Sequence, residues 1–316
     1  MSFDFDAAVS APFRMQPGLR RLDPAALQLT PARPGSRHMR EKLAVLSAFP
    51  SQALLQRPGF DAAPALHALA VQAAHEHPGV LQWDGERASA PVLGVAATRD
   101  GRLERLGTGR FGLGDEPLRC LQGLAPAWRL AGLLALAFEE DFAVVDAADT
   151  SIPWLAVCLP SHWAPEEKVG HPFAGVHAPV ADSALVVRAA TALTKLVTGE
   201  ERWERFVWNV TDHPRLHAHP ARVDPRRWHD TPVERGWWRT ERQTFIPLPA
   251  HGQAVFTIQV ALAPLAAAIS TPRRAARLHD AVASMSDAVL AYRSLAAVRE
   301  PLLRWLGERA AGATPT

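Results

Sequence analysis

Cysteine is scarce in this chain of 316 residues, where only Cys120 and Cys158 occur. Two widely separated cysteines supply neither a disulfide framework nor a CxxC-type ligand set for zinc or an iron–sulfur cluster. We therefore expect any redox cofactor to be held by other side chains.

Long apolar runs are also missing. The longest, from Leu130 to Phe138, falls far short of the roughly 20 residues that a membrane helix needs. The first ten residues, MSFDFDAAVS, carry acids in place of the basic region that opens a secretory signal. These patterns predict a cytoplasmic protein that does not enter a membrane.

Neither sign of charge dominates. The chain has 34 basic and 32 acidic residues, a formal net charge of +2. Such an even balance lacks the basic footprint of a nucleic-acid-binding protein, although the sequence pI is about 8.8. Lysine occurs only at Lys42, Lys168 and Lys195, so nearly all of the positive charge is arginine.

Hydrophobic residues make up 48% of the chain, enough for a sizeable core, and their spacing predicts an α+β fold. Apolar residues at three- and four-residue spacing predict helices at 36–55, 62–77, 118–138, 183–199 and 266–306. Short apolar or alternating runs predict strands at 142–146, 155–159, 206–211, 238–248 and 254–262. The expected core is an antiparallel sheet of about five strands with helical extensions at both ends of the chain.

One stretch, residues 155–180, combines an apolar strand with a segment broken by proline and glycine that holds histidine, lysine and tryptophan. Functional groups gather on irregular segments held by rigid elements, so this stretch is a candidate pocket wall. Its sequence SHWAPEEKVGHPFAGVHAPV resembles the signature of the haem-dependent oxidative N-demethylase family. Further similar motifs are PFRMQPGLRRLD at 12–23, EED at 139–141, WNVTDHP at 208–214, RTERQTFIPLP at 239–249 and AVFTI at 254–258.

The resemblance implies a PAS-like haem-binding domain, and two strands, helices and three further strands follow one another in that order here. We expect residues 1–36 to form an extended arm, 37–300 a single haem-binding domain, and 301–316 a helix end and tail. The implied reaction uses O2 to oxidise an N-methyl group of a small amine such as dimethylamine, which releases formaldehyde. The haem would be noncovalent haem b, because no CxxCH motif is present.

The resemblance also implies a redox partner. No dinucleotide-binding fingerprint and no iron–sulfur cysteine set occur in the chain, so electrons from NAD(P)H are expected to arrive through a separate flavin and iron–sulfur reductase. In the Gly-rich segment at 107–115 no lysine follows the glycines, which excludes a phosphate-binding loop.

His177 is the first candidate for the iron ligand, because imidazole is a common axial donor and the surrounding glycine and proline residues allow a close approach. A core histidine is the competing interpretation, and His171 is the fallback ligand. Lys168 is a candidate partner for a haem propionate, or a solvated surface charge. Trp163 either stacks on the porphyrin edge or fills the core.

Polar residues on the predicted strands supply the remaining candidates. Alternation places Arg239, Glu241, Gln243 and Phe245 on one face of a strand and Arg242 on the other. We name Glu241 and Asp212 as catalytic candidates that could face a protonated amine, with Glu241 preferred. Candidates for cofactor binding are Arg242 and Asn209.

Two alternatives remain open. PAS-like folds also serve as sensors, so a haem-binding protein without turnover is possible in principle. A relative that oxidises a different amine or an aromatic metabolite is the other. The histidines of DHPRLHAHP, His213, His217 and His219, do not have the spacing of a zinc site and are interrupted by proline.

Overall fold

The computed structural model describes residues 3–172 and 184–312, with side chains from 190 onward in the second range. Its centre is an antiparallel seven-stranded sheet in the order β1-β9-β10-β11-β7-β8-β2. The strands are β1 (Arg20–Arg21), β2 (Leu54–Gln56), β7 (Asp141–Asp146), β8 (Ser151–Ala156), β9 (Trp203–Thr211), β10 (Trp237–Leu248) and β11 (Gln253–Pro264). The chain is therefore α+β with an antiparallel sheet, as the sequence predicts.

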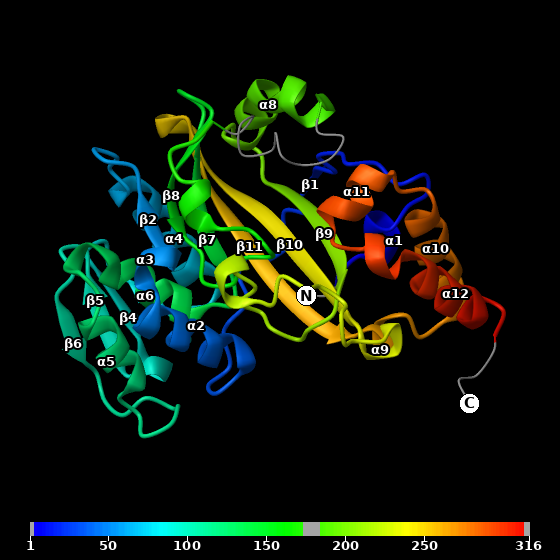
Figure 1. Ribbon diagram of the computed structural model, residues 1–316. Coiled ribbons are helices and arrows are strands. Elements are labelled where there is room, and N and C mark those ends of the chain that lie inside the picture. The colour runs from blue at the N-terminus through cyan, green and yellow to red at the C-terminus, as the bar shows by residue number, and fades with distance from the viewer. Residues whose placement is uncertain (1–2, 173–183, 313–316) are drawn as a thin grey trace.

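A second, four-stranded antiparallel sheet and groups of helices surround the central sheet (Figure 1). The strands of the second sheet are β3 (Gln82–Trp83), β4 (Arg87–Ala90), β5 (Val95–Thr98) and β6 (Leu103–Arg105). The helices before the last three central strands are α1 (Phe5–Ala8), α2 (Arg37–Ala48), α3 (Pro50–Ala53), α4 (Ala63–Glu76), α5 (Glu116–Gln122), α6 (Pro126–Ala137) and α8 (Ala184–Val197). The helices after these three strands are α9 (Leu265–Ala268), α10 (Pro272–Ala283), α11 (Asp287–Tyr292) and α12 (Arg299–Ala310). In the described part of the chain, every helix is too short or too polar to span a bilayer.

The predicted number of about five strands is wrong for the whole sheet. All five predicted strands are present and lie next to one another, but β1 and β2 extend the two edges. These edge strands have two and three residues. Such short segments show no alternation that a sequence pattern could reveal, and β2 falls where the spacing predicts the end of a helix.

The strand predicted at 155–159 is displaced, because β8 occupies Ser151–Ala156. A proline inside a strand cannot donate to the ladder, so Pro153 predicts a turn at this position. The sheet accommodates it through an irregular register between β7 and β8, near Val144 and Asp146. The carbonyl of Pro153 still accepts a hydrogen bond from the backbone N–H of Arg57.

The helix predicted over 118–138 is two helices, α5 and α6. Gly123 ends the first, and Pro126 begins the second at a position where its missing N–H costs nothing. Arg129 then donates to the carbonyl oxygens of Leu124 and Gly101, at 3.1 and 2.9 Å, which fixes the corner between α5 and α6.

Two separate apolar cores lie beside the central sheet. Helices α2, α4, α5 and α6 and the second sheet share a large apolar core with strands β7, β8, β10 and β11. A separate core joins the chain start to α10, α11 and α12 beside β9 and β10, around Trp208 and Trp238. In Figure 1 the second sheet and the C-terminal helices lie at opposite sides of the central sheet, and α8 lies across one end of it.

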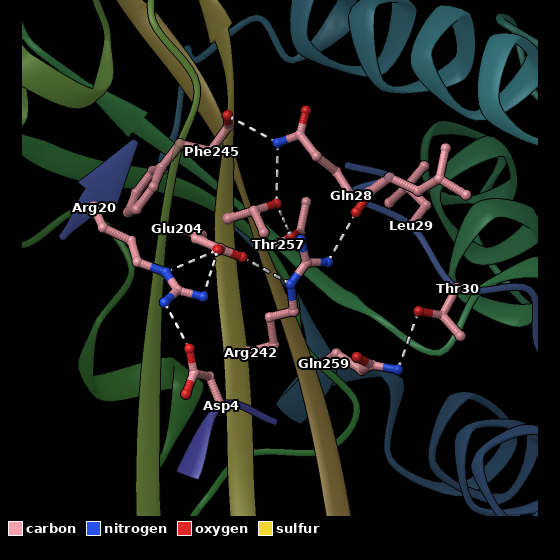
Figure 2. A network of polar contacts seen from close by, with 12 residues as sticks. Asp4, Arg20, Gln28, Leu29, Thr30, Glu204, Arg242, Phe245, Thr257 and Gln259 are labelled. Atoms are coloured by element: carbon pink, nitrogen blue, oxygen red, sulfur yellow. Dashed lines mark hydrogen bonds and ion pairs between the residues drawn. The ribbon is translucent and has the colours of Figure 1, made fainter. Parts of the chain in front are cut away.

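The N-terminal arm is tied to the sheet by a chain of charges, shown in Figure 2. Arg20 bonds to Asp4 at 2.7 Å and to Glu204 at 2.9 Å, and Glu204 in turn accepts from Arg242 at 3.0 Å. Gln28 donates across the strands to Thr244 and to the carbonyl of Phe245. The arm thus covers a sheet face, while the domain boundaries at residues 36 and 300 stay predictions.

A buried ion pair fastens α2 to the sheet. The ammonium group of Lys42 lies 3.3 Å from the carboxylate of Asp141, and both side chains are at most 1% exposed. Lys42 also donates to the carbonyl oxygens of Phe138 and Glu140, and Asp141 accepts the backbone N–H of Leu159. The ammonium group thus donates to two carbonyl oxygens and faces the carboxylate as its counter-ion.

Replacing Lys42 by methionine should lower the free energy of unfolding by about 3–5 kcal/mol, because it leaves the Asp141 carboxylate buried without its cation. Chemical denaturation of the two proteins measures this difference. The matched control is Lys195→Met on the exposed side of α8, which should change stability by less than about 0.5 kcal/mol. Equal effects of the two substitutions would contradict this account.

Candidate functional site

A strip of polar side chains crosses one face of the central sheet. In β10, Arg239, Glu241 and Gln243 alternate with residues that face the other side. The antiparallel register places Asn209 opposite Arg239 and Arg205 opposite Gln243 on β9. Directly opposite residues share a face, so the strip holds both an acid and several donors.

Arg239 is the most firmly held member of the strip and is 2% exposed. Its guanidinium donates to the carbonyl oxygens of Arg215, Leu216, Leu159 and Pro160 at 2.8 to 3.2 Å. Its Nε donates to Ser161 Oγ at 2.7 Å. Burial lowers the pKa of Arg239 to about 10, so the side chain stays charged at neutral pH.

Glu241 lies next to Arg239 on the same face and is 8% exposed. Its Oε1 accepts from the Ser161 hydroxyl and its Oε2 accepts from the Gln243 amide. Because Ser161 accepts from Arg239 and donates to Glu241, the hydroxyl links the two charges without direct contact. Among the described residues, Glu241 forms no ion pair within 4 Å.

Arg205 and Tyr292 lie at the rim of the strip. The side chain of Arg205 is partly buried, and its guanidinium makes no hydrogen bond or ion pair with residues 3–172 or 184–312. Burial lowers its pKa, and Glu241 and Tyr292 both interact with it electrostatically. Tyr292, at the end of α11, is 51% exposed. The floor of the strip is thus buried, and its rim is open.

Asp212 belongs to a different place, just beyond the end of β9. Its carboxylate accepts from Arg227 at 2.7 to 2.8 Å and from the backbone N–H of Trp228 at 2.6 Å. Burial by itself would raise the pKa of Asp212, but these hydrogen bonds outweigh burial and the net pKa is lowered. Asp212 anchors the 224–230 loop and borders a pocket of about 260 Å³ that does not include Glu241.

Two histidines near Arg227 are held as neutral hydrogen-bond acceptors. The Nδ1 atom of His162 accepts from Arg227 at 3.1 Å, and that of His213 accepts from the backbone N–H of Arg215 at 3.2 Å. In each neutral ring the proton therefore sits on Nε2, which is a poor arrangement for a metal ligand. Burial and Arg227 lower the pKa of His162 to about 2 and that of His213 to about 4.

The other histidines of this region are also engaged. His217 bonds to the carbonyl of Cys158 at 2.7 Å, and His219 bonds to Glu166 at 3.1 Å. No group of three potential metal ligands was found where the structure describes the chain.

Arg242 faces away from Glu241. Its guanidinium bonds to Glu204 and to the carbonyl of Leu27 at 2.9 Å, on the face covered by the arm (Figure 2). Asn209 is on the Glu241 side, but its amide donates to the carbonyl of Arg293 at 3.3 Å and its oxygen accepts the N–H of Val210. As the alternation predicts, Arg242 therefore lies on the opposite face from Glu241, outside the strip.

The remaining candidates come from residues 161–177. Trp163 is partly buried and packs with Val169 against the apolar residues of β7 and β8. Lys168 follows a short 3-10 helix, Pro165–Glu167, and its backbone oxygen accepts the N–H of His171. The side chain of His171 is exposed. His177, the first candidate for the iron ligand, lies outside the described residues.

Comparison with known families gives a match. Residues 122–303, more than half of the chain, match the sequence model of the haem-dependent oxidative N-demethylase, alpha subunit-like family. The chain belongs to this family. The match contains every motif that carries the resemblance except residues 12–23 of the arm. Membership in the N-demethylase-like family indicates haem dependence and an oxidative activity.

One family-like motif, residues 139–141, is structural in this fold. Glu139 accepts from Gln259 at 3.0 Å, Glu140 accepts the backbone N–H of Thr30 at 2.9 Å, and Asp141 pairs with Lys42. Burial raises the pKa of Glu140 to about 7. Three consecutive acids thus hold a strand, the arm and a helix to the sheet.

The described residues on the Glu241 face fit a haem in their chemistry. A haem has a flat apolar macrocycle and two carboxylates, so it needs apolar contact surface and cationic partners. Val207, Phe256 and Trp163 are partly exposed apolar side chains of this face or its border, and Arg205 is a guanidinium without a partner among the described residues.

The sequence-based selection missed Arg205, Ser161 and Tyr292. Arg205 lies one residue before the strand predicted at 206–211, and only the register with Gln243 brings it to the site. Ser161 and Tyr292 come from a loop and a helix far from β10 in sequence. Strand alternation extended by one residue would have found Arg205, but nothing local indicates the other two.

The neutral histidines predict a loss of stability in acid. In the unfolded chain His162 binds a proton near its ordinary pKa of 6.5, whereas in the folded protein it does so only near pH 2. As pH falls below 6.5 the unfolded state therefore gains protons that the folded state does not, and stability falls by roughly 1 kcal/mol per pH unit for this side chain.

His162→Asn should remove that contribution, because asparagine does not titrate and tolerates the positive φ of 63° at this position. Denaturation at pH 6.5, 5.5 and 5.0 should give a shallower decline for the variant than for the parent protein. His229→Asn, in an exposed ring, serves as the control and should leave the decline unchanged. Parallel curves for parent and His162→Asn would show that His162 titrates alike in both states.

Proposed function

We propose that this protein is a haem-dependent monooxygenase that removes an N-methyl group from a small secondary amine and releases formaldehyde. Family membership supports oxidative N-demethylation as the class of reaction. The observation that carries the choice of an amine is the buried carboxylate of Glu241, which lacks an ion pair within the described residues.

A PAS-like haem-binding fold is part of this proposal. Two strands, β7 and β8, precede α8, and three strands, β9 to β11, follow it, which is the chain order expected for such a domain. The haem-binding residues would come from the stretch that resembles the family signature, with His177 as iron ligand and Lys168 and Trp163 beside the haem. When bound, the haem supplies the iron at which O2 is activated.

Glu241 would orient the amine. A secondary amine is a cation at neutral pH, and moving it into a partly dry site requires a compensating negative group. Ser161 and Gln243 each donate to one oxygen of Glu241, which leaves a lone pair of each oxygen for the ligand. The carboxylate can also accept the proton that the amine nitrogen must lose before or during oxidation.

Arg239 holds Ser161 and Glu241 in fixed positions. Because each of its three nitrogens is bonded to a carbonyl oxygen or to Ser161, the guanidinium cannot swing to pair with Glu241 directly. It holds the Ser161 hydroxyl in place as a donor to Glu241. A site held on a strand by such contacts orients a substrate with little loss of entropy on binding.

Electrons would come from a separate reductase that uses NAD(P)H with flavin and iron–sulfur chemistry, and O2 would be the second substrate. Neither a dinucleotide fingerprint nor a cysteine ligand set occurs in this sequence. A non-catalytic haem sensor is the competing function, and turnover with a reductase separates the two.

Purified protein should bind haem b and show a Soret band, and His177→Ala should change its ferric and ferrous absorption spectra. The matched variant is His171→Ala, whose exposed side chain should leave both spectra unchanged. Absence of a Soret band after haem reconstitution would refute haem binding. A change caused by His171→Ala alone would move the ligand to that residue.

Glu241→Gln should weaken amine binding at least tenfold, about 1.4 kcal/mol, while haem content stays near that of the parent protein. The substitution keeps the shape and removes the charge, and the Ser161 hydroxyl can accept from the new amide. Titration of the haem spectrum with dimethylamine measures the affinity.

Asp212→Asn tests the other carboxylate with the same change of charge. It should lower thermal stability by weakening the bonds to Arg227 and leave amine affinity within twofold. If Asp212→Asn weakens binding and Glu241→Gln does not, Asp212 faces the amine.

A further inference from the structure

Arg205 and Glu241 carry opposite charges on one face of the sheet and yet do not pair. Arg205 is opposite Gln243, and Glu241 is two residues along the same strand. Diagonal neighbours of this kind have Cα atoms about 7–8 Å apart, within reach of long side chains. The two groups interact electrostatically, but no hydrogen bond or ion pair joins them.

Gln243 explains the separation. Its amide donates to Glu241 Oε2, and the register puts Gln243 directly opposite Arg205, so its side chain lies next to both charges. Ser161 occupies Glu241 Oε1 in the same way. Each carboxylate oxygen is therefore held by a neutral donor, and Arg205 has no carboxylate partner among the described residues.

Such a separation is costly without a ligand. A partly buried charge is poorly solvated, and a partner that supplies the opposite charge recovers the lost free energy. Here the acid lies on a buried floor and the guanidinium on an open rim beside Tyr292, whose hydroxyl is a further hydrogen-bond donor. A ligand that spans floor and rim would contact the carboxylate of Glu241 at one end and the guanidinium of Arg205 at the other.

We propose that the substrate is a zwitterion, an N-methylated amino acid, whose ammonium group faces Glu241 and whose carboxylate is bound by Arg205 with Tyr292 beside it. This proposal rests on the proposed function, because it names the class of amine. Arg205 is the specificity-determining residue, since a planar guanidinium suits bidentate binding of a carboxylate.

A carboxylate at Arg205 has two possible sources, the amine substrate and a haem propionate. The two sources have different effects. A substrate carboxylate at Arg205 would determine which amines bind, and a propionate at Arg205 would determine how tightly haem is retained. The test therefore measures both in the same proteins.

The experiment titrates the haem spectrum of the reconstituted protein with N-methylglycine, N-methylglycinamide and dimethylamine, and measures haem content and haem dissociation in parallel. The amide keeps the N-methyl amine and removes the carboxylate. The parent protein should bind N-methylglycine at least tenfold more tightly than the amide. Arg205→Gln should abolish that preference and leave dimethylamine affinity and haem content within twofold, and Arg205→Lys should restore part of it.

Arg21→Gln, an exposed arginine whose side chain is 69% exposed, is the matched control and should keep the full preference. Equal affinities of the parent protein for N-methylglycine and its amide would overturn the proposal. Loss of haem in Arg205→Gln with an unchanged preference would overturn it too and assign Arg205 to a propionate. Binding of dimethylamine alone would leave the proposed function intact, whereas failure of all three amines to bind would contradict that function as well.

Discussion

The burial of Arg239 is the constraint on which the site depends. A guanidinium that is 2% exposed needs acceptors, and here its nitrogens find them in the backbone of two separate loops and in Ser161. The loops at 159–161 and 215–216 are thereby fixed to the beginning of β10. Losing any of these acceptors would leave a buried charged donor unsatisfied, at a cost of about 1–3 kcal/mol or more.

Because the backbone and Ser161 hold the guanidinium of Arg239, its hydrogen bonds reach Glu241 only through Ser161. This explains how an acid and two arginines can share one strip of sheet without forming ion pairs. Gln243, which is opposite Arg205, likewise donates its amide to Glu241 and occupies the second carboxylate oxygen. Neutral hydrogen-bonding side chains therefore keep the charges available for a ligand.

Because side chains alternate along a strand, the two faces of β10 have different roles. Thr244 and Arg242 face the arm and bind Gln28 and Glu204, which makes them part of the scaffold. Glu241 and Gln243 face the other way and are free of the arm. Beyond β9, the neutral pair His162 and His213 and the Asp212–Arg227 pair complete a polar wall that holds the 224–230 loop.

The sequence by itself determined the class of fold, the five inner strands and the two faces of β10, because strand alternation and helical spacing are local properties. It also indicated the family through long motifs. It could not determine that Arg242 pairs with Glu204, since this contact depends on which strand lies beside β10 and on where the arm passes. Only the tertiary structure brought Ser161, Arg205 and Tyr292 to Glu241, because the register of β9 against β10 and the positions of a loop and of α11 are set by long-range packing that no local pattern records.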